Sequence, residues 1–312
     1  MVSRMSRIPP YLKPGSRVGI TCPAGAVTME EMQPMLAQLQ QWGFEVVLGR
    51  TVGNAYFRFA GTDDERLLDL QAMLDDASID AILFGRGGYG TVRILDRIDF
   101  SSFVKKPKWL LGYSDITAFH SHVHTRLGIA TIHGHMCAGY KPENADAAST
   151  QSIFDVLCGQ VSHYHSDPHP LNCAGLGQGL LVGGNLALLS DLLGTPSDLD
   201  TRGKILFIED IGEYRYNIDR MMWQLLRAGK LDALAGLLVG GFTDTQDNEI
   251  PFGWSEEEIV WEKVRNLGYP VCFGFPVGHQ PRNVALKCGA PFFLQVTEAG
   301  AELWEMSGWQ GV

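Results

Sequence analysis

Residues 108–128 read KWLLGYSDITAFHSHVHTRLG and place a strand directly before a helix. The apolar residues 109–111 have the length of a short buried strand, and Gly112 begins a tight turn. After the turn, apolar residues recur at helical spacing until Gly128, a typical helix stop: Ile116, Phe119, Val123 and Leu127. This stretch predicts a strand–turn–helix unit of an α/β protein.

The rest of the first half repeats this alternation. Apolar runs at residues 17–21, 44–48 and 79–84 predict strands, and the pairs Thr28/Glu31 and Thr62/Glu65 have the spacing of helix capping boxes. Strands that alternate with helices form right-handed βαβ units with a mostly parallel sheet. We therefore expect an N-terminal flavodoxin- or Rossmann-like domain, with ligands beyond the carboxyl ends of its strands.

The second half has its own strand and helix signals. Residues 161–179 are rich in His, Pro, Asn and Gly, which favours a linker between two domains. Strands are expected at 204–208 and 234–239, a helix at 220–226, and short strands with loops over 273–294. The predicted division is an N-terminal α/β domain over 1–160, a linker over 161–179 and a smaller C-terminal α/β domain over 180–312.

Charge and composition disfavour several classes of partner. The 312 residues carry a formal charge of −10, which disfavours nucleic acids and anionic membranes. The start, MVSRMSRIPPYLKPG, has two arginines with no apolar run behind them, so we do not expect a secretory signal. Six cysteines without a CxxC pair are typical of reduced thiols. We expect a cytoplasmic protein without a membrane partner.

Ser114 lies where the predicted strand turns into the predicted helix. A serine there can be a nucleophile, because backbone N–H groups at a helix start can stabilise an oxyanion. The turn lacks the second glycine of G-x-S-x-G, since Ile116 stands in its place. Ser114 can instead be merely the N-cap of the helix, and spacing alone favours this alternative.

The loop 85–90, GRGGYG, also follows a predicted strand and has three possible roles. Its spacing matches G-x-G-x-x-G, so a dinucleotide site with Asp115 as ribose-binding acid is one alternative. The glycines can instead bring a backbone N–H to a substrate beside Ser114, or simply form a turn with positive φ. Because the loop follows about the third strand rather than the first, the nucleotide alternative is weak.

Further candidate groups follow later strands. Glu209 and Asp210 end an apolar strand, where a carboxylate can orient a histidine or simply precede a helix. His279 lies between Pro276 and Pro281 on a loop, where a histidine is more often solvated than catalytic. Three other histidines alternate along one helix without a carboxylate or cysteine nearby, so we expect no metal site: His120, His122 and His124.

Together these segments resemble the LD-carboxypeptidase family, which includes murein LD-carboxypeptidases and microcin-immunity peptidases. The resemblance runs from about residue 17 to residue 289. It is carried by the order and spacing of seven motifs: FAGTD (59–63), RGGYG (86–90), GYSDIT (112–117), GGNL (183–186), LFIED (206–210), IDR (218–220) and GH (278–279).

The resemblance implies the roles of the candidate residues. The serine of GYSD is the family's nucleophile, so Ser114 becomes the expected nucleophile, with Glu209 and His279 completing a triad. The family's oxyanion hole implies backbone amides of Asp115 and Gly87. The family also implies homodimers and no cofactor.

The expected substrate is a murein tetrapeptide that loses its terminal D-alanine during cell-wall recycling. We expect Arg86, Gly88 and Glu213 to line its pocket. His135 stands where many relatives have proline, which leaves the pocket shape open. The alternatives are a microcin-immunity peptidase, a nicotinamide-dependent oxidoreductase and a non-catalytic peptide-binding protein.

Overall fold

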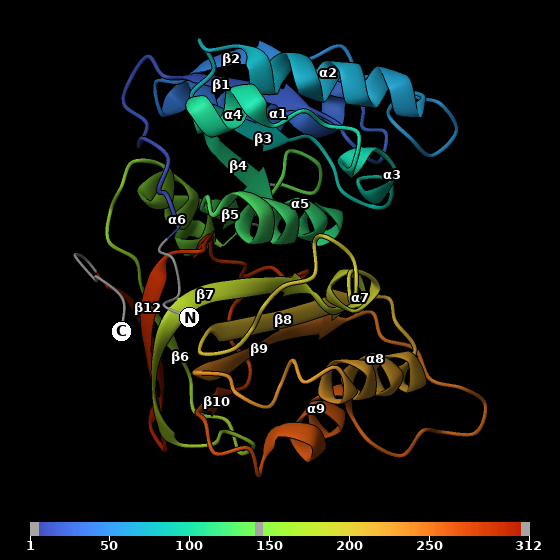
Figure 1. Cartoon of the computed structure of the whole chain (residues 1–312), viewed down its shortest axis with the longest axis vertical. Coiled ribbons are helices and arrows are strands. Elements are labelled where there is room, and N and C mark those ends of the chain that lie inside the picture. The colour runs from blue at the N-terminus through green and yellow to red at the C-terminus, as the bar shows by residue number, and fades with distance from the viewer. Residues whose placement is uncertain (1–5, 141–145, 307–312) are drawn as a thin grey trace.

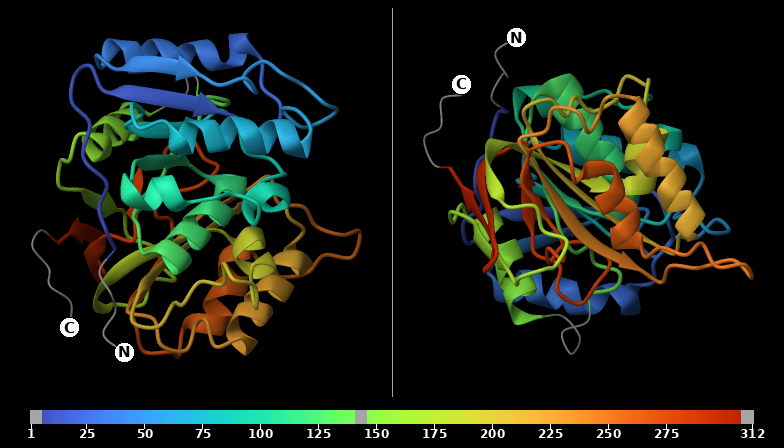
Figure 2. Two further views of the ribbon diagram at one scale, coloured as in Figure 1. Left: turned by 45° about the horizontal axis from the view of Figure 1, so that its top comes forward. Right: turned by 90° about the horizontal axis from the view of Figure 1, so that it is seen from below.

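The computed structural model describes residues 6–140 and 146–306. The first five residues of the arginine-containing start lie outside these ranges. The chain folds into two sheets stacked one above the other, with helices between and around them (Figure 1 and Figure 2). None of the helices within the described ranges has the length and apolar character that a membrane crossing requires.

The first sheet has the order β11-β5-β4-β3-β1-β2. Its five N-terminal strands are parallel, and their order 2-1-3-4-5 is that of flavodoxin-like folds, which confirms the expected fold class. Their bounds are β1 Arg17–Thr21, β2 Glu45–Leu48, β3 Ala81–Phe84, β4 Trp109–Gly112 and β5 Thr131–His133. Strand β11, Leu286–Cys288, pairs antiparallel with β5, so a segment far along the chain closes this sheet.

Helices cover both faces of the first sheet, as its apolar strands require. The longer helices α1 (Met29–Gln41) and α2 (Asp63–Asp75) both begin with the capping boxes that the sequence predicts. The others are α3 Val92–Leu95, α4 Ser101–Lys105, α5 Thr117–His122 and α6 Ala147–Leu157. After α5 the chain forms a π-helical turn, η2 Val123–Leu127. This helical segment ends at Gly128, whose φ is +62°. Pro34 lies inside α1 without ending it.

The second sheet has the order β10-β9-β8-β7-β12-β13-β6. Strands β7 to β10 are parallel, and the other pairs are antiparallel. Their bounds are β6 His163–Ser166, β7 Gly175–Asn185, β8 Ile205–Ile211, β9 Gly236–Thr243, β10 Val271–Cys272, β12 Pro291–Thr297 and β13 Gly300–Glu305. Helices α7 (Leu186–Asp191), α8 (Arg215–Arg227) and α9 (Glu256–Val264) contribute to one apolar cluster on this sheet.

The segment 161–179 differs from the expected linker. It contains β6 and the first residues of β7, which pair with β13 and β12 near the other end of the chain. The histidines and glycines of this segment therefore lie in or beside strands. The partner strands supply hydrogen bonds to its backbone, and composition does not predict this pairing. The division at residues 160 and 180 remains a proposal.

Candidate active site

Ser114 occupies a strained turn at the carboxyl end of β4. Its φ is +62°, a conformation that a non-glycine residue rarely adopts and that costs on the order of 1–3 kcal/mol. It begins a 3₁₀ turn, η1 Ser114–Ile116, whose N-cap is Tyr113, and no side-chain hydrogen bond caps that turn. The N-cap alternative is therefore wrong, and the backbone has the form of a nucleophile elbow.

Glu209, which is buried, pairs with His279, which is partly buried. Nδ1 of His279 lies 2.7 Å from Oε2 of Glu209, which is fully buried at the end of β8. Since a carboxylate only accepts, Nδ1 carries the hydrogen, and Nε2 remains available as a base. Gly278 allows this approach, because a Cβ there would lie 2.7 Å from the Glu209 Cβ.

Tyr113 connects this pair to the turn at Ser114. Its ring lies 4.7 Å, between centroids, from the ring of His279, and Ser114 is the next residue along the chain. Burial and the Glu209 carboxylate raise the pKa of Tyr113 to about 12, so the phenol is neutral at ordinary pH. Tyr113 is a site residue that the sequence did not indicate beyond its place in the GYSD motif.

A hydrogen-bonded chain fixes the two halves of the site relative to each other. The Asn185 backbone N–H donates to Oγ1 of Thr117, at 3.0 Å, and its side-chain amide donates to Oδ1 of Asp210, at 2.7 Å. All three residues are buried, and Asp210 adjoins Glu209. We call Thr117, Asn185 and Asp210 the clamp. Burial raises the pKa of Asp210 to about 6, and the neighbouring Glu209 adds to this shift.

The glycine loop 85–90 lies beside the turn at Ser114. A Cβ on Gly87 would be 3.3 Å from the Ser114 Cβ, and the Gly87 carbonyl accepts from the Gly25 N–H at 3.0 Å. The Asp115 carboxylate accepts from the Thr91 N–H at 2.9 Å and is almost fully buried. Because Asp115 is used inside the protein, it does not offer the ribose-binding carboxylate that the dinucleotide alternative requires.

Three buried histidines surround the rear of the site. Burial lowers the pKa of His120 and of His135 to about 4 and that of His133 well below its usual value, so these rings are neutral. His133 and His135 lie 5.8 and 5.9 Å from the Tyr113 ring. No group of three or more His, Cys, Asp or Glu side chains within the described ranges could hold a metal ion.

The expected substrate-binding residues lie in different surroundings. Arg86 and Gly88 line an open hollow of about 310 Å³ beside the glycine loop. Glu213 is half-buried, and its carboxylate accepts from the Asn217 side chain at 3.0 Å. Among the described residues, no hydrogen bond joins Glu213 to Ser114 or to His279.

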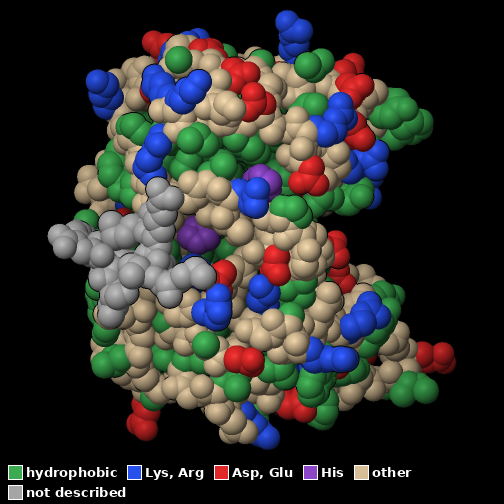
Figure 3. All heavy atoms as spheres, viewed as in Figure 1, with side chains coloured by type: hydrophobic (Ala, Val, Ile, Leu, Met, Phe, Trp, Pro, Cys, Tyr) green, Lys and Arg blue, Asp and Glu red, His purple; other side chains and the backbone are tan. Residues whose placement is uncertain are grey.

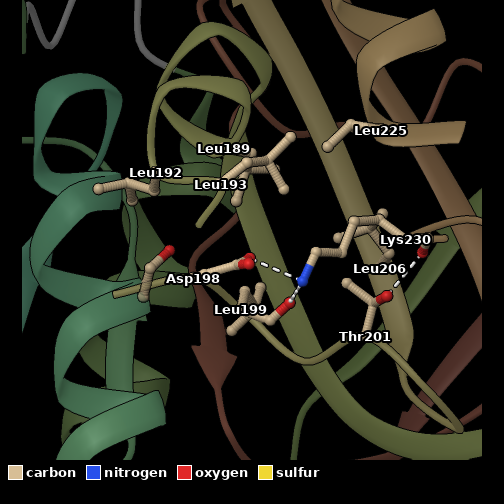
Figure 4. Close-up of a pocket in the computed structure, with 10 residues that line it drawn as sticks. Leu189, Leu192, Leu193, Asp198, Leu199, Thr201, Leu206, Leu225 and Lys230 are labelled. Atoms are coloured by element: carbon tan, nitrogen blue, oxygen red, sulfur yellow. Dashed lines mark hydrogen bonds and ion pairs between the residues drawn. The ribbon is translucent and has the colours of Figure 1, made fainter. Parts of the chain in front are cut away.

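Another hollow, between α7 and the second sheet, does not fit a substrate. Leucines and the ion pair of Lys230 with Asp198, at 2.7 Å, line it (Figure 4). Its volume of about 10 Å³ holds at most one water molecule. In the space-filling view, the outline of the protein is indented at one edge where the two halves meet (Figure 3).

Comparison with known proteins identifies the family. The LD-carboxypeptidase N-terminal domain matches residues 18–134, and the LD-carboxypeptidase C-terminal domain matches residues 178–294. The chain is 38% identical to a probable murein peptide carboxypeptidase of Bacillus subtilis, over 94% of this chain and 93% of the relative. It is 32% identical to a murein tetrapeptide carboxypeptidase of Pseudomonas aeruginosa, over 95% and 98% of the two chains.

Solved structures show the same fold. A muramoyltetrapeptide carboxypeptidase from Oxalobacter formigenes superposes with a TM-score of 0.85 at 27% identity, over 93% of this chain and 98% of that chain. The wild-type microcin C7 self immunity protein superposes equally well, with a TM-score of 0.85 over 96% and 99% of the chains, but at 20% identity this shows the fold alone. The chain belongs to the LD-carboxypeptidase family.

Proposed function

We propose that this protein is a serine carboxypeptidase that releases the C-terminal D-alanine from murein tetrapeptides. The observation that carries the proposal is the hydrogen bond between the buried Glu209 and His279, whose ring contacts Tyr113 immediately before the strained Ser114. The relatives named murein peptide carboxypeptidases, at 32–38% identity, support the substrate class.

In the proposed reaction, Oγ of Ser114 attacks the carbonyl between an L-configured centre and the terminal D-residue. Nε2 of His279 takes the serine proton and returns it to the leaving amine, while Glu209 holds the imidazole tautomer. The backbone N–H groups of Asp115 and Gly87 stabilise the oxyanion. Water then hydrolyses the acyl-enzyme by the same route, and free enzyme and peptide result.

The strain at Ser114 supports this assignment on energetic grounds. A residue that only shaped such a turn would usually be glycine, which adopts positive φ without a steric penalty. A serine at φ +62° is retained at a cost of on the order of 1–3 kcal/mol, and such strain is concentrated at functional sites. In a nucleophile elbow, a strained turn of this kind exposes Oγ at the end of the strand, and the N–H of the next residue contributes to the oxyanion hole.

We also propose that the enzyme acts in the cytoplasm, as a homodimer, on peptides from cell-wall recycling. All six cysteines are free thiols in the structure, as a reducing compartment requires. The dimer rests on the family resemblance, and size-exclusion chromatography with light scattering tests it.

Mass spectrometry of three peptides tests the function. We expect D-alanine release from L-Ala-D-Glu-diaminopimelate-D-Ala, little action on the pentapeptide that ends in D-Ala-D-Ala, and little on an all-L tetrapeptide. The discrimination should appear in kcat/KM, because a misplaced carbonyl loses the oxyanion contacts of the transition state. Equal cleavage of all three peptides would indicate a broad-specificity hydrolase and refute the proposal. The Ser114→Ala variant is the control for contaminating peptidases.

A further inference from the structure

A hollow opens from the glycine loop away from the candidate nucleophile. Its floor includes Gly87, the residue that lies against Ser114, and Gly88. Its walls come from two other segments, residues 25–26 after β1 and residues 57–58 before α2. Hydrogen bonds join these segments to the glycine loop and to each other. The Gly25 N–H donates to the Gly87 carbonyl, and the Ala26 N–H donates to the Arg58 carbonyl, both at 3.0 Å. The hollow is therefore a built feature that begins beside the proposed oxyanion hole.

Two arginines, Arg58 and Arg86, line this hollow in a protein of net charge −10. Arg86 is half-exposed and donates from Nη1 to the Ala26 carbonyl at 3.1 Å, with a Glu31 oxygen 3.8 Å away. The guanidinium carbon of Arg58 lies over the Tyr89 ring, 5.7 Å from the ring centroid, which is within cation–π range. Within residues 6–140 and 146–306, no carboxylate forms an ion pair with Arg58. Stacking holds a guanidinium by its face and leaves the N–H donors at its edge free.

Phe57 adds an exposed aromatic ring to the same hollow. Its side chain is 88% exposed and its φ is +56°, so this residue combines an apolar surface with a strained backbone. Tyr89, 43% exposed, lies in the same lining. Exposed rings can pack against the apolar parts of a peptide, and cationic groups beside them can bind its carboxylates. The volume of about 310 Å³ is that of a subsite for part of a peptide.

We propose that Arg58, together with Arg86, forms an anion subsite that binds a carboxylate of the peptide substrate. This inference rests on the proposed function and adds Arg58 to the binding residues. The guanidinium fork matches the two oxygens of a carboxylate, and a murein peptide offers several: the terminal carboxylate and the free carboxylates of its D-Glu and diaminopimelate residues. The subsite thus selects acidic peptides although the protein itself is acidic.

Calorimetry of peptide binding tests this subsite without turnover. The tetrapeptide is titrated into the Ser114→Ala protein and into the Ser114→Ala/Arg58→Gln double variant. We expect Arg58→Gln to weaken binding by about ten- to a hundredfold, as the loss of a charge-assisted hydrogen bond does, and Arg58→Lys to weaken it less. Arg202→Gln, at an exposed arginine whose carboxylate partner is Asp200, is the matched control and should leave binding unchanged.

Amidated peptides identify the carboxylate. Three tetrapeptides, each amidated at one position (terminal residue, D-Glu or diaminopimelate), are titrated into the same two proteins. For one of them, the effect of Arg58→Gln should disappear, because the group that Arg58 binds is already missing. An Arg58→Gln effect that is equal for all four peptides, or absent for the parent peptide, overturns the inference, as does a parent peptide that does not bind. Wild-type protein that binds the peptide but releases no D-alanine refutes the proposed function instead.

Discussion

Thr117→Val tests the clamp that relates the two halves of the site. Oγ1 of Thr117, in the first turn of α5, accepts the N–H of Asn185, which ends β7, and both groups are buried. Valine has nearly the same shape, so the substitution removes the acceptor while the packing around it stays nearly unchanged. Asn185 on β7 lies opposite Glu209 on β8 in the sheet. A shift of β7 therefore moves Glu209, which is the hydrogen-bond partner of His279.

The size of the effect follows from the contact that is lost. A buried N–H without a partner costs about 1–3 kcal/mol, which lowers the midpoint of thermal unfolding by roughly 2–10 °C in a protein of this size. A misplacement of about 1 Å can reduce a catalysed rate by roughly a hundredfold. We therefore expect kcat to fall roughly ten- to a hundredfold while KM changes little, because the clamp does not contact the hollow beside the glycine loop.

Calorimetry and steady-state kinetics on the tetrapeptide measure both effects. Thr117→Ser is the matched control, since it keeps the hydroxyl acceptor and removes only a methyl group. The serine variant should retain most of its kcat even where its stability falls slightly. Valine and serine variants with the same kcat would refute the role of the hydrogen bond, and a valine variant with wild-type stability and kcat would refute the clamp altogether.

Further predictions concern the strain, the carboxylates and the buried histidines. Ser114→Ala and Ser114→Gly should both be inactive, and denaturant unfolding should show the glycine variant at least as stable as the alanine variant, although glycine ordinarily costs about 0.5–1 kcal/mol. Glu209→Gln should lower kcat roughly 10⁴-fold, whereas Glu213→Gln should change mainly KM; steady-state kinetics that show the opposite pattern would exchange their roles. The pKa of His120, about 4, lies below the ordinary 6.5, so its stabilising contribution is complete above about pH 6.5 and is lost as the pH falls toward 4. Between pH 7.5 and pH 5, the unfolding free energy of the wild type should therefore fall by about 2 kcal/mol more than that of His120→Gln, and equal losses would contradict the buried neutral ring.

Several elements were predictable because their signals are local. The capping boxes at Thr28 and Thr62 start α1 and α2 where the sequence places them, and the stop signal at Gly128 lies at the end of the helical segment. Caps and helical periodicity depend on residues within one or two turns, so a single sequence carries them completely. The order of these elements was enough to predict a parallel α/β sheet.

Strand partners far apart along the chain were not predictable in this way. β6 and the start of β7 lie in a segment whose Gly, Pro and His content favours a linker and gives no strand signal, yet they pair with β13 and β12. Strand β11 likewise joins the first sheet through β5, although it lies more than 150 residues later in the chain. Such edges form because backbone N–H and C=O groups need partners, and composition does not say which strand supplies them.

For the candidate site, the sequence by itself determined which residues end their strands, and resemblance to a family supplied their roles. Spacing alone predicts that Ser114 is a helix cap and that His279 is a solvated loop residue. Only the tertiary structure decides that φ at Ser114 is positive, and that His279 meets a carboxylate 70 positions away. The physical reason is that backbone strain and a hydrogen bond to a buried carboxylate are maintained by packing between distant segments. Strands and a glycine turn from distant parts of the sequence enclose Glu209. This enclosure holds its carboxylate in place as the hydrogen-bond partner of His279.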